Sequence, residues 1–86
     1  MQLYTKNNCS ACEEVKMMLD QMGLGNKVVI TNVTNDLVKV MQIKDRLEIQ
    51  GNPMTFPVLE LEDKTLINPS KAIKEFLTYI VGVKKD

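Results

Sequence analysis

The sequence of 86 residues contains no histidine and no tryptophan, and it has only two cysteines, Cys9 and Cys12. Histidine is the commonest general base at neutral pH, so its absence excludes hydrolases in which histidine activates a serine or a cysteine. A closed structural zinc site needs about four ligands, which two thiols without histidine do not supply. We therefore expect no resident metal and no bound cofactor, although a second subunit or outside thiols would still allow a bridging iron–sulfur cluster.

The chain also lacks an excess of charge of either sign and any long apolar segment. Eleven Lys and Arg balance eleven Asp and Glu, which argues against a nucleic-acid partner. Its apolar runs are far shorter than the roughly 18 residues that a transmembrane helix needs. The amino terminus lacks the basic start and apolar stretch of a secretory signal. We expect a cytoplasmic protein with neither nucleic acid nor membrane as a partner.

Length and composition together predict one compact domain over residues 1–86. Hydrophobic residues make up 44% of the chain and charged residues 26%, which is typical of globular proteins. Eighty-six residues are too few for two independent cores. We expect the domain to be a monomer.

Strand-like and helix-like segments alternate along the chain. Short segments rich in β-branched or alternating apolar residues predict strands at residues 1–4, 27–32, 56–62 and 65–67. Apolar residues at helical spacing predict three helices. Their inward residues are expected to be Val15, Leu19 and Met22 in the first, Leu37, Val40, Met41 and Leu47 in the second, and Ile73, Phe76, Leu77 and Ile80 in the third. Asn35 and Asp36 are expected to cap the second helix, and Asn68, followed by Pro69, the third. The order β-α-β-α-β-β-α predicts an α/β fold, with a mixed four-stranded sheet flanked by helices on both faces.

Cys9 and Cys12 lie where the first predicted strand gives way to the first predicted helix. Side chains three residues apart meet on one helical face with Cβ atoms about 5–6 Å apart, which is close to disulfide geometry. Unpaired N–H groups and the positive end of the helix dipole favour a thiolate at Cys9. Because a disulfide over so short a loop adds little stability, a redox-active pair is favoured. Two inert, reduced cysteines are the alternative.

Two segments carry a resemblance to a known family. The run from Tyr4 to Cys12, with Cys9-Ser10-Ala11-Cys12 at its end, and the later run Thr55-Phe56-Pro57-Val58-Leu59 resemble glutaredoxins and glutaredoxin-like thioredoxins. The resemblance spans essentially the whole chain and implies the thioredoxin fold. It also implies a cis peptide bond before Pro57, beside the cysteines, with the Phe56 backbone free to pair with an extended substrate or with glutathione. One alternative is that Pro57 is an ordinary trans proline that opens a strand, and Pro53 is the less favoured candidate for the cis proline.

The resemblance implies further binding residues and also breaks down at one point. Lys6, three residues before Cys9, matches a lysine that holds the glycine carboxylate of glutathione in glutaredoxins, with Lys44 or Arg46 as possible helpers. Glutaredoxins usually carry Gly-Gly and an acidic residue before the last helix, where this chain has Asn68-Pro69-Ser70-Lys71-Ala72. Ser70 and helix N–H groups still suit a carboxylate, but no acid meets the ammonium of glutathione, and Lys71 opposes it.

These features lead to two readings of different classes. The first is a thiol–disulfide oxidoreductase that reduces protein or glutathione mixed disulfides, with Cys9 attacking, Cys12 resolving, and Lys6, Thr55, Phe56, Pro57 and Ser70 binding the substrate. Its partners are disulfide-containing proteins, ribonucleotide reductase among them by resemblance, and its donor is either glutathione or thioredoxin reductase. The second is a redox-inactive thioredoxin-fold module that binds a peptide in a groove at Phe56 and Pro57.

Overall fold

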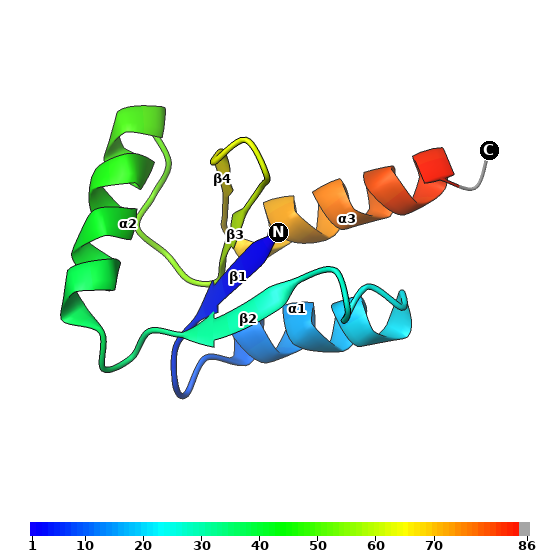
Figure 1. Ribbon diagram of the computed structural model, residues 1–86, viewed down its shortest axis with the longest axis horizontal. Coiled ribbons are helices and arrows are strands. Elements are labelled where there is room, and N and C mark those ends of the chain that lie inside the picture. The colour runs from blue at the N-terminus through cyan, green and yellow to red at the C-terminus, as the bar shows by residue number, and fades with distance from the viewer. Residues whose placement is uncertain (85–86) are drawn as a thin grey trace.

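The computed structural model describes residues 1–84 as four strands and three helices (Figure 1). In chain order they are β1 (Gln2–Thr5), α1 (Ser10–Gln21), β2 (Val29–Asn32), α2 (Leu37–Gln50), β3 (Val58–Glu60), β4 (Leu66–Ile67) and α3 (Ser70–Lys84). The last two residues of the predicted domain, Lys85 and Asp86, lie outside the described residues. The predicted order of elements is confirmed. Within residues 1–84, no helix is long and apolar enough to cross a membrane.

The four strands form one mixed sheet in the order β2-β1-β3-β4. β1 runs parallel to β2 and antiparallel to β3, and β3 and β4 form an antiparallel hairpin. Three strands are shorter than predicted. The second begins at Val29 because Lys27 lies in a turn, the third spans only Val58–Glu60 because Phe56 and Pro57 belong to the preceding loop, and the fourth is Leu66–Ile67, without Thr65. The sheet and its connections are those of the predicted thioredoxin fold.

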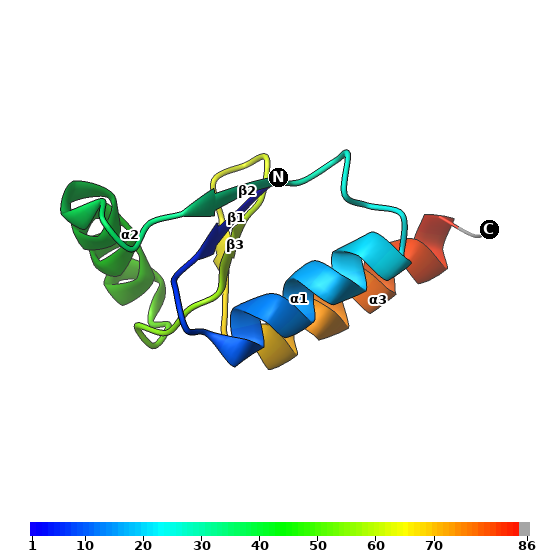
Figure 2. The same ribbon diagram turned by 90° about the horizontal axis from the view of Figure 1, so that it is seen from below.

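Helices cover both faces of the sheet, as Figure 2 shows, with α1 and α3 side by side on one face and α2 on the other. The first face holds the larger apolar core, built on Leu3, Val15, Leu19, Leu59, Ile73 and Leu77. The second face holds a smaller core of Tyr4, Val33, Ile43, Leu47, Val58 and Leu66. β1 contributes neighbouring residues to both cores, because successive side chains of a strand point to opposite faces.

The inward face predicted for α2 is wrong in part. Leu37 and Met41 are 71% and 58% exposed, whereas Ile43 and Leu47 are fully buried and Val40 is partly buried. Residues 40, 43 and 47 follow one narrow stripe of the helix. Met41 lies about 100° around the helix from Val40 and so points away from the sheet. This narrow apolar stripe is enough to pack α2 against the sheet, because α2 is the helix that covers this face.

Asn68 does not cap α3, contrary to the prediction. Its side-chain amide donates instead to the backbone of the loop before β3, to the carbonyl oxygens of Pro53 at 2.6 Å and Thr55 at 3.0 Å. The carbonyl of Pro69 accepts from the N–H of Ile73, so Pro69 is the residue that begins the hydrogen bonding of α3. Asn68 therefore joins the start of α3 to the loop that holds Phe56 and Pro57.

Candidate active site

The two cysteines lie at the amino end of α1, reached from β1 by a short turn. Asn8 in that turn has a φ of 55°, a left-handed conformation that asparagine tolerates better than most residues. Cys9 has an extended backbone and acts as the cap of α1: its Sγ accepts the N–H of Cys12 at 3.1 Å, and its carbonyl accepts the N–H of Glu13. The helix start therefore presents a backbone donor to the sulfur of Cys9.

Cys9 and Cys12 form a disulfide, with their Cα atoms 5.2 Å apart. Their exposure differs, because Cys12 is 1% exposed whereas Cys9 remains partly open to solvent. Cys12 lies one turn into α1 on the side that faces the core. An external reactant therefore meets the sulfur of Cys9 before that of Cys12.

The loop before β3 forms the wall facing Cys9. The carbonyl oxygen of Phe56 lies 4.0 Å from Cys9 Sγ, and because a disulfide sulfur carries no proton, this approach is a contact rather than a hydrogen bond. The peptide bonds before Pro57 and Pro69 are cis. Pro57 is buried and Thr55 is exposed. The structure thus brings the two motif segments, 47 residues apart at Cys9 and Phe56, to the same place.

The loop is held by contacts that the sequence analysis missed. Asn68 Nδ2 donates to the carbonyl oxygens of Pro53 and Thr55, and it also contacts Thr55 Oγ1. Asn68 itself is buried, and among residues 1–84 its Oδ1 has no hydrogen-bond partner. The only sequence signal was an asparagine in a turn before proline, and it points to helix capping rather than to this loop.

Two of the predicted binding residues, Lys6 and Ser70, lie on different elements. Lys6 is exposed next to the loop, with its Nζ 5.6 Å from the centroid of the Phe56 ring. Ser70 begins α3 and is partly buried. Lys74 Nζ meets Glu14 Oε2 at 3.1 Å, joining the fifth residues of α1 and α3, so these helices begin close together (Figure 2). The amino end of α3 therefore lies beside that of α1.

Arg46, suggested by the sequence as a helper in binding, is engaged elsewhere. Its Nη1 donates to Glu60 Oε2 at 2.8 Å, and its Nη2 donates to the carbonyl oxygen of Lys64. Tyr4 donates its hydroxyl to the other oxygen of Glu60 at 2.7 Å. Burial and the hydrogen bond to Glu60 raise the pKa of Tyr4 to about 12. Arg46 thus belongs to a polar cluster under α2, while Lys44 remains exposed.

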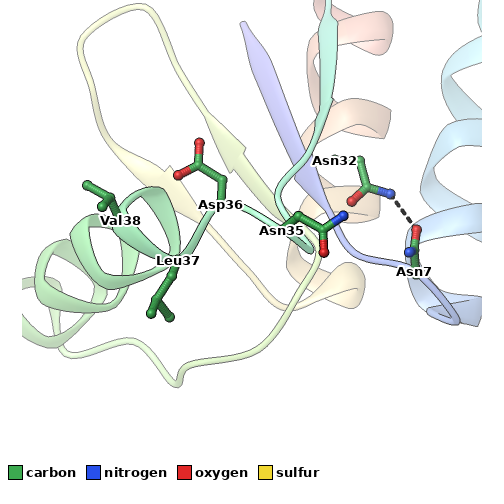
Figure 3. A pocket seen from close by; sticks show the side chains of 6 residues that line it. All are labelled: Asn7, Asn32, Asn35, Asp36, Leu37 and Val38. Atoms are coloured by element: carbon green, nitrogen blue, oxygen red, sulfur yellow. Dashed lines mark hydrogen bonds between the residues drawn. The ribbon is translucent and has the colours of Figure 1, made fainter.

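A polar recess opens beside the turn that precedes Cys9 (Figure 3). It is lined by Asn7, Asn32, Asn35, Asp36, Leu37 and Val38. Asn32 Nδ2 donates to Asn7 Oδ1 at 2.8 Å, which ties the end of β2 to the turn. The Asn7 N–H also donates to Thr34 Oγ1 at 2.7 Å. These contacts hold the turn before Cys9 against the end of β2 and the segment that follows it.

The residues described offer little for a metal ion. Within residues 1–84, no group of three or more His, Cys, Asp or Glu side chains is placed to hold one. The two cysteine sulfur atoms are reactive groups at this site, and a cysteine pair of this spacing is able to exchange between thiol and disulfide.

Comparisons with known proteins agree with this geometry. The family model described as Glutaredoxin matches residues 1–66. Among solved structures, the chain is similar to a glutathione S-transferase domain-containing protein from Marinobacter aquaeolei VT8, with 30% sequence identity and a TM-score of 0.69. That match covers 90% of this chain but 37% of the other, so this chain spans well under half of its length. A search of curated proteins finds no match.

Proposed function

Because the chain belongs to the glutaredoxin family, we propose that it is a dithiol electron carrier that reduces disulfides through Cys9 and Cys12. The observation that carries the proposal is the Cys9–Cys12 disulfide at the start of α1, with one sulfur open to solvent and the other buried. Such a pair needs little movement to open and close, because Cys9 caps α1 and Cys12 lies three residues later in its first turn.

The reaction proceeds in two exchanges. The Cys9 thiolate attacks one sulfur of the substrate disulfide, which forms a mixed disulfide and releases the first substrate thiolate. The Cys12 thiolate then attacks Cys9 Sγ, which forms the Cys9–Cys12 disulfide and releases the second substrate thiolate. Two electrons pass to the substrate, the released thiolates take up two protons, and the protein ends in the oxidised state observed here.

Contacts at the start of α1 support this division of roles. The Cys12 N–H, 3.1 Å from Cys9 Sγ, stabilises negative charge on that sulfur in the reduced protein, where Cys9 is the attacking thiolate. The low exposure of Cys12 keeps it from competing for bulky substrates and leaves it beside the mixed disulfide.

We assign substrate binding to the loop facing Cys9. The Phe56 carbonyl oxygen near Cys9 Sγ suits main-chain pairing with an extended peptide or with glutathione. Lys6, above the Phe56 ring, suits a carboxylate, and Thr55 and Ser70 offer hydroxyl groups for further hydrogen bonds. Disulfide-containing proteins are the proposed substrates, ribonucleotide reductase among them by family resemblance, and the cytoplasm is the proposed location.

A disulfide-reduction assay tests the proposal and separates it from a redox-inactive peptide-binding module. The wild type is expected to reduce a model disulfide, whereas Cys9→Ser is expected to be inactive because the attacking sulfur is gone. Cys12→Ser is expected to stop after one exchange with protein disulfides and to accumulate the mixed disulfide, seen by mass spectrometry. A wild type no faster than Cys9→Ser would exclude the oxidoreductase and leave the binding module.

A further inference from the structure

The two edges of the sheet differ in how their backbone groups are satisfied. On β4, Leu66 donates its N–H to Gln50 Oε1 and accepts from Gln50 Nε2, both at 2.9 Å. Asn52 Nδ2 also donates to the Leu66 carbonyl. Amide side chains thus take the place of a further strand on that edge. On the opposite edge, no side chain within residues 1–82 hydrogen-bonds the backbone of β2.

The ladder between β1 and β2 leaves alternate residues of β2 facing outward. The N–H of Val29 bonds to the carbonyl of Met1, and the N–H of Val33 bonds to that of Thr5, both at 2.9 Å. Ile30 and Asn32 occupy the alternate positions, so their N–H and C=O groups point away from β1. An edge with free backbone groups of this kind is a template for another strand.

The side chains along this edge do not oppose pairing. Soluble proteins usually protect an edge strand with charged residues, proline or a bulge. Residues 28–32 are Val-Val-Ile-Thr-Asn, with no charge and no proline. Val29 is 63% exposed and Ile30 is 44% exposed, and β-branched apolar residues are those that cross-strand packing favours.

We propose that β2 pairs antiparallel with β2 of a second copy of this chain, so that the two sheets become one. A two-fold axis at Ile30 sets Ile30 opposite the partner's Ile30 and Asn32 opposite the partner's Val28, which uses the outward groups of both chains. The first charged residues on either side of the segment are Lys27 and Asp36. Antiparallel pairing brings the lysine end of each strand to the aspartate end of the other, so the charges are complementary.

The pairing leaves the cysteines open and does not depend on their chemistry. Cys9 faces Phe56, in the loop before β3, and β3 lies on the other side of β1 from β2. The net charge of zero adds no general repulsion between two copies. The dimer replaces the monomer expected from the sequence.

Sedimentation equilibrium over a range of concentrations tests the dimer, with Ile30→Lys as the disrupting variant. The two lysines would face each other across the axis, so the dissociation constant is expected to rise by about tenfold or more. Ile49→Lys is the matched control, since Ile49 is 86% exposed on α2, away from β2. A wild type that stays monomeric at the highest concentration, or equal weakening by both substitutions, overturns the proposal.

Amide hydrogen exchange on the wild type tests the register without any substitution. The Ile30 and Asn32 amides are expected to exchange more slowly in concentrated than in dilute protein, whereas the Val29 amide, already bonded to Met1, is expected to change little. Exchange at Ile30 that does not depend on concentration contradicts the pairing. Cys9→Ser is expected to dimerise as the wild type does. If this variant were monomeric, the wild-type dimer would be held by a disulfide through Cys9 and not by strand pairing.

Discussion

Cys9 and Cys12 differ in exposure, and this difference predicts how the reduced protein reacts with alkylating agents. Iodoacetamide is expected to label Cys9 first, because Cys12 is 1% exposed and because the Cys12 N–H stabilises a thiolate on Cys9. Peptide mapping after brief labelling at neutral pH measures the ratio. Faster labelling of Cys12 would reverse the roles assigned to the two thiols.

Glu60 is a buried carboxylate whose ionisation contributes to folding. Burial favours its neutral form, but the Tyr4 hydroxyl and Arg46 outweigh burial and lower the pKa of Glu60 below its ordinary value of 4.5. A carboxyl whose pKa falls on folding stabilises the protein above its unfolded-state pKa, and this contribution is lost as the pH falls through the folded-state pKa. The free energy of unfolding is therefore expected to decrease below pH 4.5.

Glu60→Gln tests this contribution. At pH 7 the variant is expected to lose about 1–3 kcal/mol of unfolding free energy, because Arg46 and Tyr4 lose a charged acceptor. Urea unfolding at pH 7 and at about pH 3.5, with exposed Glu48→Gln as the control, is the measurement. The difference between wild type and Glu60→Gln is expected to shrink at the lower pH, and a constant difference would contradict the assignment.

Local sequence patterns predicted contacts between individual residues only where they are close in sequence, and the position of Pro57 beside the cysteines came from the family resemblance. Cys9 and Cys12 were identified because helical geometry alone brings residues three apart together. The hydrogen bond from Asn68 to Thr55 spans 13 residues, and the ion pair of Arg46 with Glu60 spans 14. These pairs form only when the hairpin docks beside α2 and the loop, which no local pattern encodes.

At the scale of elements, α2 seals the β4 edge through Gln50. Gln50→Ala is expected to lower the free energy of unfolding by about 1–2 kcal/mol, because the N–H of Leu66 loses its partner and its C=O keeps only the longer contact to Asn52 Nδ2. Gln42→Ala, an exposed substitution on the same helix, is the control and is expected to change little. Denaturant unfolding gives the difference, and equal effects of the two substitutions would show that Gln50 does not hold the edge.

Whether each segment forms a strand or a helix was predictable from the sequence. Which face of a helix is buried was not always predictable. Strand and helix order followed from local spacing, caps and turns. In α2, however, Leu37 and Met41 are as apolar as Ile43, and only the position of the sheet decides that Ile43 is the buried one. Apolar residues on several sides of a helix leave its orientation open until a partner surface is specified.

For the whole molecule, the arrangement of strands in the sheet was predicted from connectivity rules rather than from residue patterns. The strand–helix–strand start requires a parallel pair, and the short link before residue 65 requires an antiparallel one. Together they predict the mixed sheet that the structure has. The same sheet brings the turn before Cys9 and the Phe56 loop together, so the two motif segments became one site through topology.

We expect the choice of electron donor to depend on the face formed by the amino ends of α1 and α3. Lys71 is exposed in the first turn of α3, and the segment leading into this helix lacks the acid that in glutaredoxins usually meets the ammonium of glutathione. One charge-assisted contact contributes about 1.5–3 kcal/mol, so its loss weakens binding by roughly 10- to 150-fold. We therefore expect thioredoxin reductase to regenerate the oxidised protein faster than glutathione does.

Lys71→Asp tests this expectation. Turnover of one model disulfide is measured with NADPH and either thioredoxin reductase or glutathione plus its reductase. The substitution is expected to raise glutathione-driven turnover about tenfold, because it removes a lysine that repels the ammonium of glutathione and supplies the missing acid. Lys27→Asp, in the turn before β2, makes the same charge change away from the cysteines and is expected to have no such effect. Efficient glutathione-driven turnover by the wild type, unimproved in Lys71→Asp, would show that Ser70 and the amino end of α3 bind glutathione without an acid.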